Sequence, residues 1–474
     1  MTSFIANNMA PLMFAGLVVF LLIGYPAAFS LAAVGLFFGM IGIELGLIRP
    51  DFLGNLTYQL FGIISNDLLL SIPFFTLMGA ILERCGLAED LLDSVGQLFG
   101  PVRGGLSYAV ILVGAILGAI TGTVAASVIA MAVIALPVMT RYGYSIRHTT
   151  GVIAASGTIT QLIPPSLVLI VLADQLGKSV GDMYKGAIGP SLIQLALFCG
   201  YVFALSIVRP QDVPALPKEA RTLHGWALWA KCLRGIVPSV GLIFLVLGTI
   251  FLGLATPTEA GALGVVGAFA LAAFNRTLTW PLVWQGMSTT MRITAFVVFI
   301  LIGARVFSLV FQGVGGKEWI EHWLAALPGG QIGFLIFVNI FIFIIAFFLD
   351  FFEIVFIVIP LLTPVAEKLG IDLIWFGVLI CANVQTSYMH PPFGFALFYL
   401  RGIAPPSVKS SDIYLGAIPW VFLQVLLVII LIFWPGSVTY WLDKPSSVDP
   451  STIKLDIPQI EAPQLDFSDP VKKK

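Results

Sequence analysis

Charged residues are scarce in this chain: they make up 10% of its 474 residues, and its net charge at neutral pH is −1. So few charges do not solvate the surface of a soluble protein of this length. The balance also excludes nucleic acid as a partner, because phosphate binding depends on a concentrated face of Lys and Arg side chains.

Cysteine and histidine are equally sparse, with four of each. The cysteines, Cys85, Cys199, Cys232 and Cys381, have no CxxC spacing, so the sequence predicts neither a zinc site nor a disulfide framework. No GxSxG, HExxH or Walker motif occurs, and no second ligand residue lies at metal-ligand spacing from His390. We therefore expect that the protein is not an enzyme.

Long apolar runs are abundant instead. Apolar residues make up 58% of the chain, and its mean hydropathy is +1.00. Because a bilayer core of roughly 30 Å takes about 20 apolar residues of helix, the runs predict an all-α polytopic membrane protein. The expected spans lie near 10–28, 28–48, 58–83, 150–174 and 187–208, then near 237–253, 257–274, 288–312, 373–400 and 413–434.

Two interrupted apolar segments, 106–139 and 330–366, do not fit single spans. Each is too long for one crossing and too short for two at about 20 residues each. Two half-length arms that enter and leave on one side fit the length, with the first break at Ile120 to Thr123. A polar turn at that depth is tolerated only where protein or a water-filled cavity surrounds it. We expect a re-entrant hairpin in each half.

The second half of the chain repeats the order of the first. Pro164–Pro165 matches Pro391–Pro392, and Leu136-Pro137-Val138 matches Ile359-Pro360-Leu361 at a similar offset. Each half then has five transmembrane spans plus one re-entrant hairpin, and the odd number of crossings turns the second half upside down relative to the first. The sequence therefore predicts two inverted repeats.

Domain boundaries follow from this repeat. We expect a first inverted repeat at 1–208, a cytoplasmic linker with an interfacial helix at 209–236, a second inverted repeat at 237–436, and a disordered periplasmic tail at 437–474. Lys and Arg gather in the loops on the linker's side, and cytoplasmic loops are enriched in them. Both termini are therefore expected in the periplasm, with the first hairpin open to the cytoplasm and the second to the periplasm.

The two Pro-Pro pairs interrupt the fourth span of each half. Proline lacks an N–H, so the carbonyls four residues earlier lose their helical partner: Thr160 and Gln161, then Ser387 and Tyr388. A desolvated sodium ion takes oxygen ligands, and broken transporter helices supply carbonyls to such ions. The alternative is an ordinary kink whose carbonyls Ser or Thr side chains and water satisfy. Two matched pairs favour the ion site.

Other polar residues in these segments are candidates for binding. The small residues at 121–123 and Ser127 suit a hairpin tip, although they also allow close helix packing. Asp350 either binds a cation or caps the second hairpin arm. Arg305 either meets a substrate carboxylate or pairs with an acidic residue. His390 either contacts substrate or takes part in proton coupling, or else is a neutral, hydrogen-bonded histidine.

The stretch Thr256-Pro257-Thr258-Glu259 indicates a helix start. A Thr N-cap, Pro at the first helical position and Glu at the third form a capping box, so we expect a structural role here.

These features together resemble the large membrane (M) subunit of tripartite ATP-independent periplasmic (TRAP) transporters, over roughly residues 8–436. The stretches that carry the resemblance are Ile72-Pro73-Phe74-Phe75-Thr76-Leu77-Met78-Gly79 with Glu83-Arg84-Cys85-Gly86-Leu87-Ala88, Ile163-Pro164-Pro165-Ser166, Thr256-Pro257-Thr258-Glu259-Ala260, Phe348-Leu349-Asp350 and Pro391-Pro392-Phe393-Gly394.

The resemblance implies an elevator-type transporter in the bacterial inner membrane. Its function would be sodium-coupled secondary active uptake of an organic acid, a carboxylate such as a dicarboxylate. It implies two protein partners: a small four-helix membrane (Q) subunit and a periplasmic substrate-binding (P) protein that delivers the acid. Rival hypotheses are a stand-alone dicarboxylate carrier with a similar fold, and an intramembrane enzyme or scaffold protein.

Expected site residues combine the residue pattern with the family's sodium sites, which carry over to the first hairpin tip, to Ala346 and to the stretches before the Pro-Pro pairs. The expected Na+ ligands are Thr121, Gly122, Thr123, Gly157, Thr160, Gln161, Ile163, Ala346, Asp350, Ser387 and His390. The expected substrate contacts are Ser127, Ser166, Arg305, Asn383, Gln385 and His390. The family often has Thr at His390 and Gly at Thr160 and Ser387.

Overall fold

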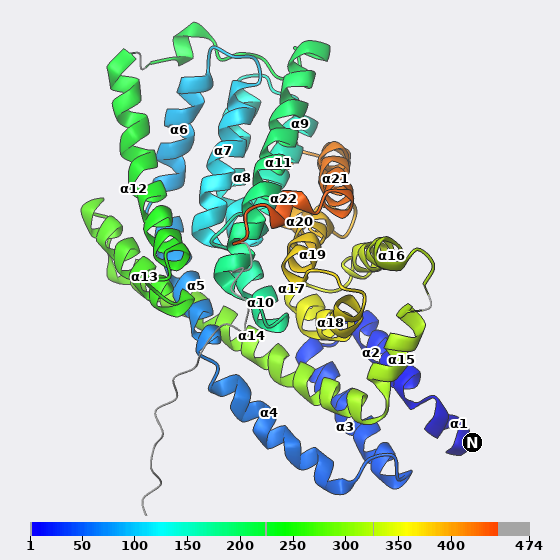
Figure 1. Ribbon diagram of the computed structural model, residues 1–474. Coiled ribbons are helices and arrows are strands. Elements are labelled where there is room, and N and C mark those ends of the chain that lie inside the picture. The colour runs from blue at the N-terminus through cyan, green and yellow to red at the C-terminus, as the bar shows by residue number, and fades with distance from the viewer. Residues whose placement is uncertain (1, 223–224, 326, 444–474) are drawn as a thin grey trace, which may run out of the picture. The chain divides into compact units, whose positions relative to one another are not determined.

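The computed structural model describes residues 2–222, 225–325 and 327–443 (Figure 1). Helices joined by turns make up this part of the chain, and it contains no β-strand. The expected all-α class is confirmed.

The helices of the first half extend to residue 208. They are α1 (Thr2–Asn7), α2 (Met9–Ile23), α3 (Ala27–Glu44), η1 (Pro50–Gly54), α4 (Asn55–Ile64), η2 (Asp67–Leu70), α5 (Ser71–Glu83), α6 (Leu87–Phe99), α7 (Gly105–Thr121), α8 (Val124–Arg141), α9 (Ile146–Thr158), η3 (Ile159–Gln161), α10 (Leu167–Gln175) and α11 (Val180–Val208).

The second half continues after the short helix η4 (Lys218–Ala220). Its helices are α12 (Gly225–Phe251), α13 (Pro257–Phe274), α14 (Trp280–Gly313), α15 (Gly316–Ala325), α16 (Gly330–Ile345), α17 (Phe351–Glu353), the π-helix η5 (Ile354–Val358), α18 (Ile359–Lys368), α19 (Leu373–Ser387), α20 (Phe395–Ile403), α21 (Ser410–Phe433) and α22 (Gly436–Thr439).

Membrane-crossing helices dominate the described residues. Seven helices are long and apolar enough to span a bilayer, or eight if a bent pair counts as one span. The protein is therefore a polytopic membrane protein, as its composition predicts.

The predicted span at 58–83 is not one straight helix. Pro50–Ile64 and Asp67–Glu83 meet at an angle of 47°. The reason is local: the Asn66 side chain accepts a hydrogen bond from the Leu68 amide at 3.0 Å and so caps the next helix. Asn competes in this way with the helical backbone ladder.

The boundary expected at 236–237 does not mark a helix end. Helix α12 continues from Gly225 to Phe251, so the expected interfacial helix and the following span are one helix. Pro238 lies inside it, and membrane helices tolerate such prolines. The helices α6 and α15 were not anticipated by the sequence reading.

The expected tail at 437–474 begins later than predicted. Ser437 and Val438 are buried in α22, which packs against α11 and α19. An apolar side chain at Val438 explains why this turn is held against the protein. The remainder of the expected tail, from residue 444, lies outside the described residues.

Both interrupted segments are built as pairs of helices. In the first, α7 and α8 contact each other and are joined by Gly122 and Thr123 alone (Figure 1). In the second, α16 ends at Ile345, and the other arm runs through α17, η5 and α18. The π-helical turn ends at Val358, two residues before Pro360, which has no N–H to give to a regular helix.

Packing between the halves is crosswise. Helix α3 packs on α14 while α13 packs on α5, and α9 packs on α21 while α19 packs on α11. Every one of these contacts joins a helix of the first half to a helix of the second. The capping box predicted at Thr256 and Glu259 is confirmed and starts α13 in this arrangement.

The broken helices lie at the centre of the buried core. Every residue of α19 is buried, and so is α9 from His148 onward. Polar residues of both helices are thereby removed from lipid and water, so each needs a partner inside the protein.

Candidate functional site

The first broken helix passes from α9 through the short helix η3 to a cis Pro164–Pro165 bond and then to α10. Ser166 is the N-cap of α10: its hydroxyl accepts from the Val168 amide at 3.2 Å and donates to the Gln161 carbonyl at 2.6 Å. The expected substrate contact Ser166 is therefore already used to close the break.

The first hairpin tip lies against this break. Gly122 has φ +63°, a left-handed conformation that suits glycine, and a Cβ there would lie 3.3 Å from the Leu167 side chain. A Cβ at Gly118 would lie 2.8 Å from the Thr160 Cα. The expected ligand positions Gly122 and Thr160 are therefore brought together at one place, with Thr121 ending α7 and Thr123 beginning the second arm.

Unpartnered oxygens mark the same place. Thr160 and Gln161 are buried, and neither the Thr160 hydroxyl oxygen nor the Gln161 side-chain oxygen Oε1 has a hydrogen-bond partner among the described residues. The Gln161 carbonyl, in contrast, accepts from Ser166 and from the Cys381 thiol at 3.2 Å. The break thus leaves side-chain oxygens open rather than the backbone oxygen expected at Gln161.

Gly157 and Ile163 flank this group. A Cβ at Gly157 would lie 3.0 Å from the Val128 backbone of α8. The second arm of the first hairpin therefore also contacts the first broken helix. The Ile163 amide donates to the Ile159 carbonyl at 3.2 Å. Ser127, one turn from the hairpin tip, is completely buried in α8 and has an interaction partner.

The second broken helix closes differently. After α19, the chain passes a cis Pro391–Pro392 bond and folds back, so that the Ala396 amide donates to the Tyr388 carbonyl at 3.0 Å. The His390 amide donates to the Ser387 carbonyl at 3.4 Å. Both carbonyls expected to be free therefore have donors from the loop itself.

His390 is buried among phenylalanine rings. Its ring centroid lies 3.9 Å from that of Phe343 and 4.6 Å from that of Phe347, both from the second hairpin. Neither ring nitrogen has a partner among the described residues, and only 3% of the residue is exposed. A buried polar ring without partners is unfavourable by about 1–3 kcal/mol, so this position is a candidate for contact with a bound molecule.

Of the two roles considered for it, Asp350 has the capping role in this structure. It is the N-cap of α17 in a capping box with Glu353, whose side chain accepts from the Asp350 amide at 3.0 Å. Its carboxylate also accepts a short hydrogen bond from the Tyr388 hydroxyl. The second hairpin is thereby tied to the second broken helix. Ala346 is the C-cap of α16 and is buried beside this tip.

Amide side chains tie the broken helices to their neighbours. Asn383 donates to the Asn339 carbonyl of α16 at 2.8 Å, and Gln385 donates to the Gln194 side chain of α11. Both amides were expected to contact substrate, and both hold helices together in this structure. Gln424 of α21 reaches the Thr158 hydroxyl of α9 at 2.9 Å.

Asn339, Gln194 and Gln424 were missed by the sequence reading. The signal was present: Gln194 and Gln424 are single buried amides at similar places in the last span of each half. A polar side chain at membrane depth indicates an internal partner.

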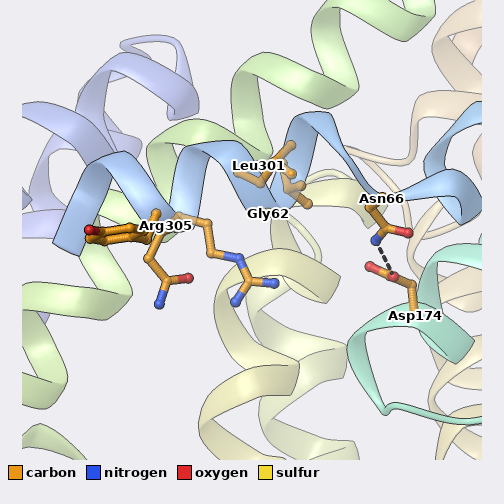
Figure 2. A pocket seen from close by; sticks show the side chains of 8 residues that line it. Gly62, Asn66, Asp174, Leu301 and Arg305 are labelled. Carbon is orange, nitrogen blue, oxygen red and sulfur yellow. Dashed lines mark hydrogen bonds between the residues drawn. The ribbon is translucent and has the colours of Figure 1, made fainter. Parts of the chain in front are cut away.

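Arg305 lies in a different place. It lines a cavity of about 270 Å³ between α4, α10 and α14, together with Tyr58, Gln59, Asn66 and Asp174. None of the other expected site residues lines this cavity. Figure 2 shows the guanidinium directed into the open space, while Asn66 is bonded to Asp174 at 2.8 Å.

No group of three or more His, Cys, Asp or Glu side chains able to hold a metal occurs in the part of the chain that the structure describes. The arrangement around Thr160 offers neutral oxygens instead, which suit a hard monovalent or divalent cation better than a transition metal.

Comparison with known proteins agrees with this architecture. The family described as "Tripartite ATP-independent periplasmic transporter, DctM component" matches residues 14–437. The chain belongs to this family. As a TRAP large permease, it is 31% identical to the C4-dicarboxylate TRAP transporter large permease protein DctM of Pseudomonas aeruginosa over 392 residues, 82% of this chain and 90% of that protein.

Other TRAP large permeases are similar over comparable lengths. The 2,3-diketo-L-gulonate permease protein YiaN of Escherichia coli is 27% identical, covering 78% of this chain and 85% of that protein. The ectoine permease protein TeaC of Halomonas elongata is 30% identical, covering 92% and 99%. All three relatives are named as permeases and none as an enzyme.

The fold of this TRAP permease is also similar to that of a solved transporter, YdaH of Alcanivorax borkumensis, whose crystal structure is described as having an unusual topology. The TM-score is 0.58 at 16% identity, and the match covers 83% of this chain and 89% of that one. The likeness concerns the fold alone.

Proposed function

We propose that this TRAP large permease carries an organic acid across the bacterial inner membrane by symport with sodium. The observation that carries the proposal is the pair of helices broken at Pro-Pro bonds, each touched by a hairpin tip, with buried unpartnered oxygens at the first break. Broken helices of this kind place ion and substrate sites near the middle of the bilayer.

Sodium is assigned to the first break. The Thr160 hydroxyl and the Gln161 Oε1 lack partners there, and the first hairpin packs against the same break, with Gly118 close to Thr160 and Gly122 close to Leu167. A bound cation would supply the missing partner and hold the tip against the broken helix. At the second break, Ser387 and His390 are weaker candidates for sodium ligands, because the loop already donates a hydrogen bond to the Ser387 carbonyl.

Substrate contact is assigned to the second hairpin and its neighbours. His390 offers two unpartnered ring nitrogens beside this hairpin, and neutral imidazole donates a hydrogen bond to a carboxylate. Several relatives are named for carboxylates, among them C4-dicarboxylate and 2,3-diketo-L-gulonate, and another is named for ectoine. An organic acid is the class these names share with the chemistry of the site.

An inverted repeat and an elevator movement complete the proposal. The crosswise contacts, α3 with α14 and α5 with α13, support the proposal, because two copies related by a twofold axis would pack in this reciprocal way. The hairpins and broken helices would move together against the remaining helices. Both termini would then lie in the periplasm, as the distribution of Lys and Arg predicts.

Two partners are part of the proposed function. A small four-helix membrane subunit would complete the permease, and a periplasmic binding protein would deliver the acid. A stand-alone carrier would transport without either one. Reconstitution with and without the binding protein separates the two hypotheses.

The test is uptake into proteoliposomes from a panel of labelled organic acids, with and without an inward sodium gradient. Thr160→Val removes one proposed ligand while keeping the side-chain shape. We expect it to raise the sodium concentration for half-maximal uptake at least ten-fold, equivalent to about 1.4 kcal/mol.

Thr149→Val is the matched control. Thr149 is also on α9, is buried, and has an unpartnered hydroxyl, but it lies at the other end of that helix from the break. Its sodium dependence should match that of the unmodified protein. Equal sodium dependence in all three proteins would refute the assigned sodium site, and uptake that ignores sodium would refute symport.

A further inference from the structure

The cavity around Arg305 is separate from the hairpin tips and the broken helices' Pro-Pro bonds. Its walls come from α4, α10 and α14. Its volume of about 270 Å³ far exceeds the 10–15 Å³ that a single water molecule needs, so it holds several waters or a small acid.

Arg305 forms no ion pair in this cavity among the described residues. Among the described residues it forms neither a hydrogen bond nor an ion pair, and it is only partly exposed. An arginine on a membrane helix is costly unless it meets an anion, a carbonyl or water. Its planar fork of donors fits the two oxygens of one carboxylate.

The only carboxylate that lines the cavity is engaged elsewhere. Asp174 accepts from the Asn66 amide at 2.8 Å with one oxygen and from the Gln175 amide at 2.8 Å with the other. Figure 2 shows the hydrogen bond between Asn66 and Asp174, and it marks none between Arg305 and the other residues drawn. Asp174 therefore forms no ion pair with Arg305.

Neutral groups complete the lining. Tyr58 and Gln59 of α4 line the same cavity as Arg305 and carry a hydroxyl and an amide. These groups suit the polar end of a small acid. One carboxylate group beside Arg305 is the occupant that this lining fits.

We propose that this cavity is a carboxylate-binding antechamber, in which Arg305 holds an organic acid before it reaches the hairpins. The binding step stands on the cavity alone, whereas the onward passage rests on the proposed transport function. Helix α10 follows the first break and belongs to the helices proposed to move, whereas α4 and α14 belong to those proposed to stay. The cavity therefore lies between the two groups of helices.

Binding is measured first, without sodium, on the full-length chain in phosphatidylcholine nanodiscs. A Tyr58→Trp reporter is titrated with acetate, with succinate and with the neutral analogue succinamide. We expect saturable changes in Trp emission with the two acids and none with succinamide. Arg305→Gln should weaken the apparent affinity for succinate at least ten-fold, and Arg305→Lys should weaken it less.

Arg292→Gln is the matched control, because Arg292 is an exposed arginine on the same helix and does not line the cavity. It should leave succinate binding unchanged. An equal response in the Arg305→Gln and unmodified reporters, or no response to either acid, overturns the antechamber. A response that appears only when phosphatidylglycerol is added, and not with the acids, assigns the cavity to a lipid headgroup and also overturns it.

Transport is measured second, using whichever acid of the uptake panel is carried. A residue of the antechamber affects the first binding of the acid and not the later transport step. Arg305→Gln should therefore raise KM at least ten-fold and change kcat less than two-fold. A collapse of kcat with KM unchanged would place Arg305 in the moving site and overturn the proposal. If no acid of the panel is transported while the reporter still binds succinate, the transport proposal fails and the binding site stands.

Discussion

At the scale of single residues, the two histidines that are buried in the described part of the chain differ in their hydrogen bonding. The His148 Nε2 is paired with the Ser107 hydroxyl at 2.7 Å and only its Nδ1 lacks a partner, whereas both His390 nitrogens lack one. Aromatic rings surround both. A buried polar group without a partner lowers stability, so His390 is kept at a site that stability alone would not favour.

His390→Leu should therefore stabilise the protein while impairing transport. Removing two unpartnered nitrogens from the phenylalanine cluster is expected to raise the free energy of unfolding by about 1 kcal/mol. The thermal midpoint in detergent, measured by scanning fluorimetry, should rise, and KM for the transported acid should rise at least ten-fold.

His148→Leu provides the opposite expectation. It breaks the hydrogen bond to Ser107 and leaves that hydroxyl buried, so the thermal midpoint should fall. If His390→Leu also lowers the midpoint and leaves KM unchanged, His390 is an ordinary core residue and its assignment to substrate fails.

At the scale of elements, two buried hydrogen bonds made by glutamines join the halves. Gln194 on α11 bonds Gln385 on α19, and Gln424 on α21 bonds Thr158 on α9. Helices that are apolar on all sides slide easily against one another, because apolar side chains do not fix their register. These buried polar pairs set the rotation of each broken helix against its neighbour.

The Gln194 and Gln385 pair allows a double-mutant test. Each single change to Leu leaves a buried amide without its partner and should lower the free energy of unfolding by about 1–3 kcal/mol. The double change should be less destabilising than the sum of the two, with a coupling of about 0.5–3 kcal/mol. Detergent unfolding titrations followed by circular dichroism measure all four proteins.

Gln312→Leu serves as the control for this cycle. Gln312 is an exposed residue of α14, so its replacement should change stability by less than about 0.5 kcal/mol. Additive effects of the Gln194 and Gln385 changes would mean that the two amides do not support each other.

At the scale of the whole molecule, the proposed inversion of the halves decides which side of the membrane each hairpin opens to. The first hairpin begins after Arg103 and the second ends at Lys368. If the halves are inverted, the residues at these ends face opposite sides. If both halves insert in the same direction, they face the same side.

Cysteine labelling tests the inversion. In a background where Cys85, Cys199, Cys232 and Cys381 are replaced by Ala, Arg103→Cys and Glu367→Cys are introduced singly at exposed positions. In spheroplasts, a membrane-impermeant maleimide should label Cys at 367 and reach Cys at 103 only after permeabilisation. Labelling of both from one side would contradict the inverted repeat.

Much of this architecture is determined by the sequence alone. Long apolar runs specify membrane helices, interrupted runs specify the two hairpins, and Pro-Pro pairs specify where α9 and α19 stop. These features are local: burial of backbone in lipid demands helix, and proline removes a donor wherever it stands. For that reason the helix class, the division of each interrupted segment into helices, and the capping box at Thr256 were predictable.

Only the tertiary structure decided which groups meet. The Gln161 carbonyl is satisfied by Ser166 and Cys381, His390 lies among phenylalanines, and Arg305 lines a cavity apart from both. Helices that are apolar all round carry no sequence signal for which face turns inward. Their rotation follows from packing and from buried pairs between residues far apart in the chain, which no local pattern records.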